Sequence, residues 1–193
     1  MHGAAERGRV AAPLIFRKDG DKSYFTDCLQ NATWLVRALD QRGHGDSAWA
    51  QPPDYSYARY AADVAEVVDK LDLRDFVLMG HSMGGAGTIY LGVKYASNWA
   101  AIGAEAPATA PAGITPTNYP LTPAKNIPMI IVQGDWDELV PVVGTRLWID
   151  QAKELGMDHK YVEIPCGTHG TPLTAAVPDI LPPVTIVAFP SRT

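Results

Sequence analysis

The stretch that decides the fold is Phe76-Val77-Leu78-Met79-Gly80-His81-Ser82-Met83-Gly84-Gly85. Its four leading apolar residues are typical of a buried strand, which would end at Gly80. Beyond Ser82, apolar side chains recur at helical spacing, at Ala86, Ile89, Tyr90 and Val93. We therefore expect a strand, a sharp turn that presents a serine, and a helix that begins just after it.

This turn has the pattern Gly-x-Ser-x-Gly. A serine hydroxyl is a poor nucleophile unless it is exposed beside a base, and a strand-to-helix turn with flanking glycines exposes it. The Met83 backbone N–H and the helix N-terminus would stabilise negative charge on a reacting carbonyl oxygen. The bare pattern arises by chance in roughly one chain of this length in fifteen. The strand before it and the helix after it are what make Ser82 a candidate nucleophile.

The rest of the chain alternates short apolar runs with helical patterns, which indicates a parallel sheet of the α/β class. Strands are expected at 34–39, 76–79, 101–104, 129–132 and 161–164. Besides the helix after the serine turn, helices are expected at 57–71, with Ser56 as N-cap, and around 147–155, where Gly156 would end the helix. The segment 107–128 is rich in Pro, Thr and Ala and is expected to be a loop.

Length and composition are typical of one globular domain. The chain has 193 residues and a formal net charge of -5, which argues against a nucleic-acid partner. No apolar run reaches membrane-spanning length and the N-terminus lacks a hydrophobic signal core, so we expect a cytoplasmic protein with no membrane partner. The two cysteines, Cys28 and Cys166, are too few for a disulfide framework.

A nucleophilic serine needs a base, and the chain offers five histidines. His169 follows the last expected strand, in the loop 165–170. The region beyond the carboxyl ends of the strands is where an open α/β sheet binds its ligand, so His169 is the strongest candidate. The others are less well placed: His2 at the terminus, His44 in a glycine-rich loop, His81 inside the turn with its side chain directed away from that of Ser82, and His159 in a polar turn.

An acid must hold the histidine ring, and two aspartates follow the strong strand at 129–132. Asp135 and Asp137 both lie in the stretch 133–141, and either could instead cap the next turn or helix. The residues alone leave this choice open. No cluster of histidines, cysteines or carboxylates has metal-ligand spacing, and no glycine-rich loop suits a nucleotide phosphate, so we expect neither a metal nor a cofactor.

Four segments in the range 34–180 resemble the α/β-hydrolase superfamily, and within it the serine esterases and lipases. Residues 39–47 resemble the loop after that family's fourth strand, and residues 77–85 resemble the turn that carries its nucleophile. Residues 134–141 are similar to its acid loop, and residues 167–170 to its histidine loop. The four motifs occur in the family's order.

This resemblance implies the roles of the site residues. In the family's acid loop the aspartate before x-x-Val-Pro is catalytic, and that position is Asp137 here. The order serine, aspartate, histidine along the chain is also the family's order. The implied triad is Ser82 as nucleophile, His169 as base and Asp137 as acid, with the Met83 backbone N–H as one donor of the oxyanion hole.

Both ends of the chain depart from the family pattern. The family places three strands and an oxyanion loop before its fourth strand, whereas residues 1–33 have room for only part of them. The second oxyanion donor is therefore unassigned, with His2-Gly3 and 17–20 as alternative positions for its loop. The atypical tail 181–193 contains two prolines, which forbid the usual closing helix and favour an extension or strand. A sheet with missing strands has an open edge, which favours a homo-oligomer.

These features predict one α/β-hydrolase-like domain over 1–193, a three-layer αβα sandwich with a mostly parallel sheet, without the family's first strands or a cap domain. The expected activity is hydrolysis of small, short-acyl esters through an acyl-enzyme, because the segment 107–128 is too short to form a cap. Two other interpretations stay open. One is different chemistry on the same triad, as in a perhydrolase, amidase or carbon–carbon hydrolase. The other is a degenerate binding protein without activity.

Overall fold

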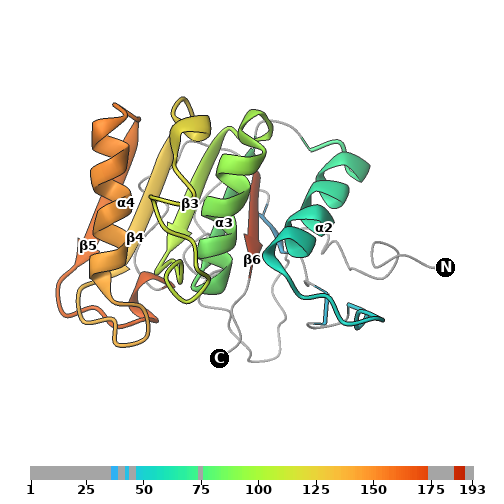
Figure 1. The fold of residues 1–193 in the computed structure, drawn as a ribbon, viewed down its shortest axis with the longest axis horizontal. Coiled ribbons are helices and arrows are strands. Elements are labelled where there is room, and N and C mark those ends of the chain that lie inside the picture. The colour runs from blue at the N-terminus through green and yellow to red at the C-terminus, as the bar shows by residue number, and fades with distance from the viewer. Residues whose placement is uncertain (1–35, 39–41, 44–46, 74–75, 174–184, 190–193) are drawn as a thin grey trace.

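The computed structural model describes residues 36–38, 42–43, 47–73, 76–173 and 185–189, which form a parallel sheet with helices beside it (Figure 1). The strands are β1 (Val36–Ala38), β2 (Phe76–His81), β3 (Ala101–Glu105), β4 (Met129–Gly134), β5 (His159–Ile164) and β6 (Thr185–Phe189). The α-helices are α2 (Tyr57–Lys70), α3 (Met83–Lys94) and α4 (Val142–Glu154). Short 3-10 helices span Ala96–Asn98, Thr122–Ala124 and Thr171–Leu173.

The strands are hydrogen-bonded in the order β1-β6-β2-β3-β4-β5, and every neighbouring pair is parallel. Because parallel strands end at the same side of a sheet, the loops after β2, β3, β4 and β5 gather along one edge. We call this the carboxyl edge. It carries all three residues of the predicted triad, Ser82, Asp137 and His169.

The three described α-helices lie on the same face of the sheet. Helix α2 connects β1 to β2, α3 connects β2 to β3, and α4 connects β4 to β5. In all three cases the second strand lies further from β1 in the sheet than the first. Since such crossovers are right-handed, this common direction places α2, α3 and α4 on one face, as Figure 1 shows. We call it the helical face. The described residues thus show two layers of the predicted sandwich.

Helix α2 follows the pattern expected from its sequence. The Ser56 hydroxyl oxygen accepts a hydrogen bond from the Arg59 backbone N–H at 3.2 Å, which confirms Ser56 as the N-cap. Ala61, Val64 and Val68 are buried and lie three or four residues apart, so they form one apolar stripe. This stripe fixes which side of α2 packs on the rest of the domain.

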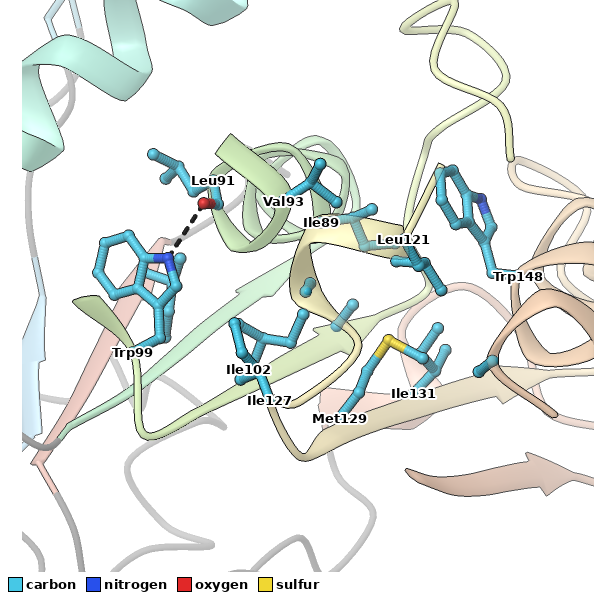
Figure 2. Close-up of a cluster of buried hydrophobic side chains, with 14 of the residues drawn as sticks. Ile89, Leu91, Val93, Trp99, Ile102, Leu121, Ile127, Met129, Ile131 and Trp148 are labelled. Atoms are coloured by element: carbon cyan, nitrogen blue, oxygen red, sulfur yellow. Dashed lines mark hydrogen bonds between the residues drawn. The ribbon is translucent and has the colours of Figure 1, made fainter. Parts of the chain in front are cut away.

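The core between the sheet and the helical face is filled by apolar side chains from both (Figure 2). Ile89 of α3, Ile102 of β3 and Ile131 of β4 are each at most 1% exposed. At one end of this cluster, Trp99 donates its indole N–H to the Leu91 carbonyl at 3.0 Å. That bond satisfies the one polar group of a buried aromatic side chain.

The segment 107–128, expected to be a loop, is an ordered connection tied to the helices. Leu121 is buried in the core cluster, and its backbone N–H donates to the Gln151 side chain of α4 at 2.7 Å. The Tyr119 hydroxyl donates to the Tyr90 carbonyl of α3 at 3.1 Å. These contacts hold the segment on the helical face.

Strand β6, from the tail of the chain, lies inside the sheet. It pairs with β1 on one side and with β2 on the other, with Val187 in register with Arg37 and with Leu78. A strand-like tail is therefore confirmed for residues 185–189. Its insertion between two strands from much earlier in the chain was not predicted.

The predicted α/β fold with a parallel sheet is confirmed, but the start of α4 was wrong. The apolar spacing placed this helix around 147–155, whereas it begins at Val142, directly after Pro141. Val142 and Val143 are β-branched and have a lower helix propensity, which hid the first turn. The atypical region 1–33 lies outside the described residues.

Candidate active site

The turn between β2 and α3 holds Ser82 in a strained backbone conformation. Its φ of 56° and ψ of -117° belong to a region that costs a non-glycine residue about 1–3 kcal/mol. The Ser82 N–H donates to the Glu105 carbonyl at 2.9 Å, and its carbonyl accepts from the N–H groups of Ala86 at 3.1 Å and Ala108 at 2.9 Å. The end of β3 and the loop after it therefore hold the turn through both the N–H and the carbonyl of the serine.

Close packing explains the glycine two residues before the serine. A Cβ atom at Gly80 would lie 2.3 Å from the Gly84 carbonyl oxygen, far inside contact distance. The chain can double back this sharply only because Gly80 has no side chain. The predicted strand–turn–helix arrangement around Ser82 is thus confirmed in its geometry.

This turn leaves the serine accessible and places a backbone donor beside it. Ser82 is partly exposed, and the next side chain, Met83, is 58% exposed. Met83 is the first residue of α3, so the helix supplies no acceptor for its N–H. The two alternatives for the second oxyanion donor, at His2-Gly3 and 17–20, lie outside the described residues.

Asp137 is a buried carboxylate with a full set of donors, in the loop after β4. Its side chain has no exposed surface. Oδ1 accepts the backbone N–H groups of Leu139 at 3.0 Å and Val140 at 2.8 Å. Oδ2 accepts the Gln133 amide at 2.9 Å and lies 2.8 Å from Nδ1 of His169. Donors on both oxygens offset the loss of water around this charge.

Gln133 connects the acid loop to α4. It is fully buried near the end of β4, and its amide nitrogen also donates to the Val140 carbonyl at 3.2 Å. Its amide oxygen accepts the Thr145 hydroxyl at 2.9 Å. Gln133 was missed as a site residue, although a polar side chain at the end of an apolar strand was an available signal.

The acid loop and the histidine loop touch backbone to backbone. The Trp136 N–H donates to the Gly167 carbonyl at 2.9 Å. A Cβ atom at Gly134 would lie 2.1 Å from that same carbonyl oxygen, so this approach requires glycine. The contact brings His169 to Asp137, although 32 residues separate them in the chain.

His169 is paired with one of the two aspartates that the sequence left open. With its Nδ1–H donating to Asp137, the ring keeps a lone pair on Nε2, as a base must. Asp135 instead buries an oxygen that has no hydrogen-bond partner in the described part of the chain. The described hydrogen bonds of His169 go to Asp137 and His81, and none joins its ring to the Ser82 hydroxyl.

His81, the residue before the serine, contacts the histidine loop. Its Nε2 lies 2.8 Å from the His169 carbonyl oxygen, and the centroids of the two rings are 4.7 Å apart. His81 is only 4% exposed, and this burial lowers the pKa of its imidazole. The sequence interpretation, which placed this side chain inside the turn, did not foresee the contact. His159 begins β5, and His2 and His44 lie outside the described residues.

Glu105 is a second buried carboxyl group at the carboxyl edge. It ends β3 and is 1% exposed, and among the described residues neither of its side-chain oxygens has a hydrogen-bond partner. Burial raises the pKa of Glu105 to about 8, so the group is largely uncharged at neutral pH. Glu105 was also missed. The available signal was an acidic residue directly after the apolar run 101–104.

No three His, Cys, Asp or Glu side chains in the described part of the chain are grouped so as to hold a metal ion. None of the helices described there is long and apolar enough to cross a membrane. Cys166 is exposed as a free thiol in the loop after β5. Cys28 lies outside the described residues.

A parallel sheet that carries a strained serine turn, followed by an aspartate and a histidine in later strand-end loops, is typical of α/β-hydrolases. The profile of the hydrolase family described as serine aminopeptidase, S33, matches residues 20–121, just over half of the chain. The chain belongs to this family, within the α/β-hydrolase superfamily.

A solved structure shares the fold. Est1E from Butyrivibrio proteoclasticus, in a structure with bound ferulic acid, matches with a TM-score of 0.59 and 22% sequence identity. The match covers 76% of this chain and 73% of that one. This likeness confirms the α/β-hydrolase fold predicted from the four motifs.

Curated relatives match over shorter stretches. RutD of Caulobacter vibrioides, assigned as a carbamate hydrolase, is 31% identical over 97 residues, which are 49% of this chain and 36% of that protein. RNA polymerase sigma-54 factor 2 of Bradyrhizobium diazoefficiens is 96% identical over 25 residues, which are 13% of this chain and 5% of that protein. The matched stretch thus spans little more than a third of RutD and a small part of the sigma-54 factor.

Proposed function

We propose that the protein hydrolyses carboxylic esters, with Ser82 as nucleophile, His169 as base and Asp137 as the acid that orients the base. The observation that carries this proposal is the 2.8 Å hydrogen bond between His169 Nδ1 and Asp137 Oδ2, at the same sheet edge as the strained Ser82 turn. It supports the proposal because a histidine held in this tautomer can accept a proton at Nε2.

The proposed reaction has two halves. In the first, His169 Nε2 takes the Ser82 hydroxyl proton while Ser82 Oγ bonds to the ester carbonyl carbon. The bond from that carbon to the alcohol oxygen then breaks, and the alcohol leaves with the proton from His169. In the second half, water gives a proton to His169 and attacks the acyl carbon. Ser82 Oγ then leaves and recovers its proton, which releases the acid.

Two further groups act on the charges that develop. Asp137 stabilises the imidazolium form of His169, and its two backbone hydrogen bonds hold the carboxylate in place. The Met83 N–H, at the positive end of α3, stabilises the negative oxygen of the tetrahedral intermediate. Neither role requires a cofactor.

The proposed substrates are small esters with short acyl chains. The segment 107–128 is tied to α3 and α4 through Tyr119 and Leu121, and it is too short to form a cap domain. Beside the site, Met83, Trp136 and Leu139 are 58%, 65% and 70% exposed. Each buried methylene adds only about 0.8 kcal/mol, and only where a wall exists. We expect kcat/KM to be higher for acetyl and butyryl p-nitrophenyl esters than for decanoyl esters. A steady rise to longer chains would contradict an open site.

The proposal is tested by Ser82→Ala, with Ser97→Ala as a matched control at an exposed serine outside the site. Loss of the nucleophile should lower kcat for p-nitrophenyl acetate by on the order of 10⁶. The control should keep the wild-type rate, and both variants should melt like the wild type. A Ser82→Ala protein that keeps the wild-type rate would overturn the proposal.

A second candidate is cleavage of an amide bond by the same residues. The observation that favours it is the family match, since the family is described as serine aminopeptidase, S33. Comparing aminoacyl p-nitroanilides with p-nitrophenyl acetate on one enzyme preparation separates the two. A higher kcat/KM for the anilides would make this protein a peptidase.

A further inference from the structure

His169 is held at two points that lie on different elements. Its ring is held by Asp137 through Nδ1, and its backbone carbonyl is held by His81 through Nε2 at 2.8 Å. His81 is the last residue of β2, directly before Ser82. The hydrogen bond therefore joins the nucleophile's own strand to the loop that carries the base.

The His81 contact fixes the protonation of that ring. A backbone carbonyl can only accept a hydrogen bond, so His81 Nε2 must carry the proton. His81 is 4% exposed, and its burial disfavours the doubly protonated form. The rings of His81 and His169 also lie against each other, with centroids 4.7 Å apart. The side chain thus offers one directed donor and one packing surface to the base.

The contacts around His81 connect the position of the serine turn to that of the histidine loop. Across the sheet, His81 is in register with Glu105, whose backbone carbonyl accepts the Ser82 N–H at 2.9 Å. The neighbouring residue Ser82 is therefore fixed to β3, while His81 itself is fixed to the histidine loop. One short stretch of β2 connects the positions of nucleophile and base.

We propose that His81 is a positioning residue, which sets the distance between the Ser82 hydroxyl and His169 by holding the His169 backbone. This inference rests on the proposed function, because it assigns His81 a role only if His169 is the base. It concerns the acylation and deacylation steps, in which His169 moves a proton. It does not concern substrate binding.

The expected effect follows from what the loop would do without this donor. The His169 side chain is 17% exposed, so its loop borders solvent. Once the His81 donor is removed, a water molecule can donate to the His169 carbonyl instead, and the loop is no longer held to β2. A misplacement of about 1 Å at a reacting group can cost about 10²-fold in rate. We therefore expect kcat to fall by about 10- to 100-fold while KM changes little.

The experiment uses graded variants at position 81 of the full chain. His81→Phe keeps a ring against His169 but removes the donor, and His81→Leu is a smaller apolar alternative. His81→Gln keeps an N–H near the place of Nε2, whereas the amide of His81→Asn falls short of it. Thr88→Val is the control, because Thr88 is a buried polar residue of α3 whose hydroxyl has no hydrogen-bond partner within the described ranges. The readouts are kcat and KM for p-nitrophenyl acetate, the rate of Ser82 labelling by a fluorophosphonate probe, and the melting temperature.

We expect slow turnover and slow labelling for the Phe and Leu variants, and substantial rescue by Gln. Thr88→Val should have the wild-type kcat. Wild-type kcat in a folded Phe or Leu variant would overturn the proposal. If neither the Phe nor the Leu variant folds, the comparison of His81→Gln with His81→Asn decides. Equal kcat values for these two variants would also overturn the proposal. A Ser82→Ala protein with the wild-type rate would instead contradict the proposed function itself. Failure of the proposed function can therefore be distinguished from failure of the role proposed for His81.

Discussion

Two buried carboxyl groups lie at the carboxyl edge, and their surroundings are opposite. Asp137 has hydrogen-bond partners on both oxygens, from Gln133, Leu139, Val140 and His169. Glu105 is also buried, but neither of its oxygens has a hydrogen-bond partner among the residues that the structure describes. One site therefore contains a carboxylate whose two oxygens are hydrogen-bonded and a carboxyl group that burial favours in its neutral form.

The difference teaches that burial alone does not decide the charge of an acid. Removing a carboxylate from water costs several kcal/mol, on the order of the penalty for any buried ion, unless donors replace the water. Asp137 has such donors and can stabilise an imidazolium beside it. Glu105 has none, and its pKa is raised to about 8. Asp137 can therefore support His169 as a base, whereas a neutral Glu105 adds no second negative charge near it.

Removing the charge of Asp137 tests the first half of this comparison and should have the largest effect. Asp137→Asn should lower kcat by roughly 10³–10⁴, because the amide favours the wrong imidazole tautomer. The matched control is Asp135→Asn, two residues earlier, which should cost far less because Asp135 has no bond to His169. Steady-state kinetics with a short-acyl ester measures both. The reverse ranking would transfer the role of the acid to Asp135.

Removing one donor from Asp137 should have an intermediate effect. Gln133→Met keeps the approximate volume of this buried side chain but deletes its bonds to Asp137, Val140 and Thr145. Leaving these groups unsatisfied should lower the free energy of unfolding by about 1–3 kcal/mol. Activity should fall less than in Asp137→Asn, since the other three donors remain. Denaturant unfolding and kcat measure the two effects, and an unchanged stability would show that the amide is not needed.

Neutralising Glu105 should have the smallest effect on catalysis, and its effect on stability should depend on pH. Its pKa of about 8 in the folded chain lies above the usual 4.5, so the folded state keeps a proton that the unfolded state releases. This contribution to stability is complete below about pH 4.5 and is lost as the pH rises through about 8. Glu105→Gln should remove that loss, which is at most about 1.4 kcal/mol per pH unit.

The measurement is the free energy of unfolding of wild type and Glu105→Gln at several pH values. The free energy of unfolding of the variant should rise steadily relative to that of the wild type as the pH rises from acid to weakly alkaline values. A difference that stays constant over this range would mean that Glu105 is charged in the folded protein, and the contrast with Asp137 would disappear.

Much of this site could be predicted because its signals are local. The turn at Ser82 is encoded in a few adjacent residues, and the N-cap at Ser56 needs only the residues that follow it. The place of His169 beyond the last predicted strand follows from the rule that ligands bind at strand ends. The choice of Asp137 over Asp135 came from family resemblance, because spacing alone could not distinguish them.

What could not be predicted depends on contacts between distant segments. The pairing of β6 with β1 joins residues from opposite ends of the chain, and no local pattern specifies it. The contact between His81 and His169 requires the histidine loop to fold back over β2. The isolation of Glu105 is a property of everything packed around it. Composition and spacing carry little information on such contacts.

The central claim is that Ser82 is a nucleophile activated by His169 and Asp137. The most direct test is reaction of the full chain with a fluorophosphonate probe, followed by mass spectrometry of the digested protein. The account predicts a single adduct on Ser82, none in Ser82→Ala, and much slower labelling in Asp137→Asn than in Asp135→Asn. An adduct on another residue, or a folded protein that the probe does not label at all, would contradict it.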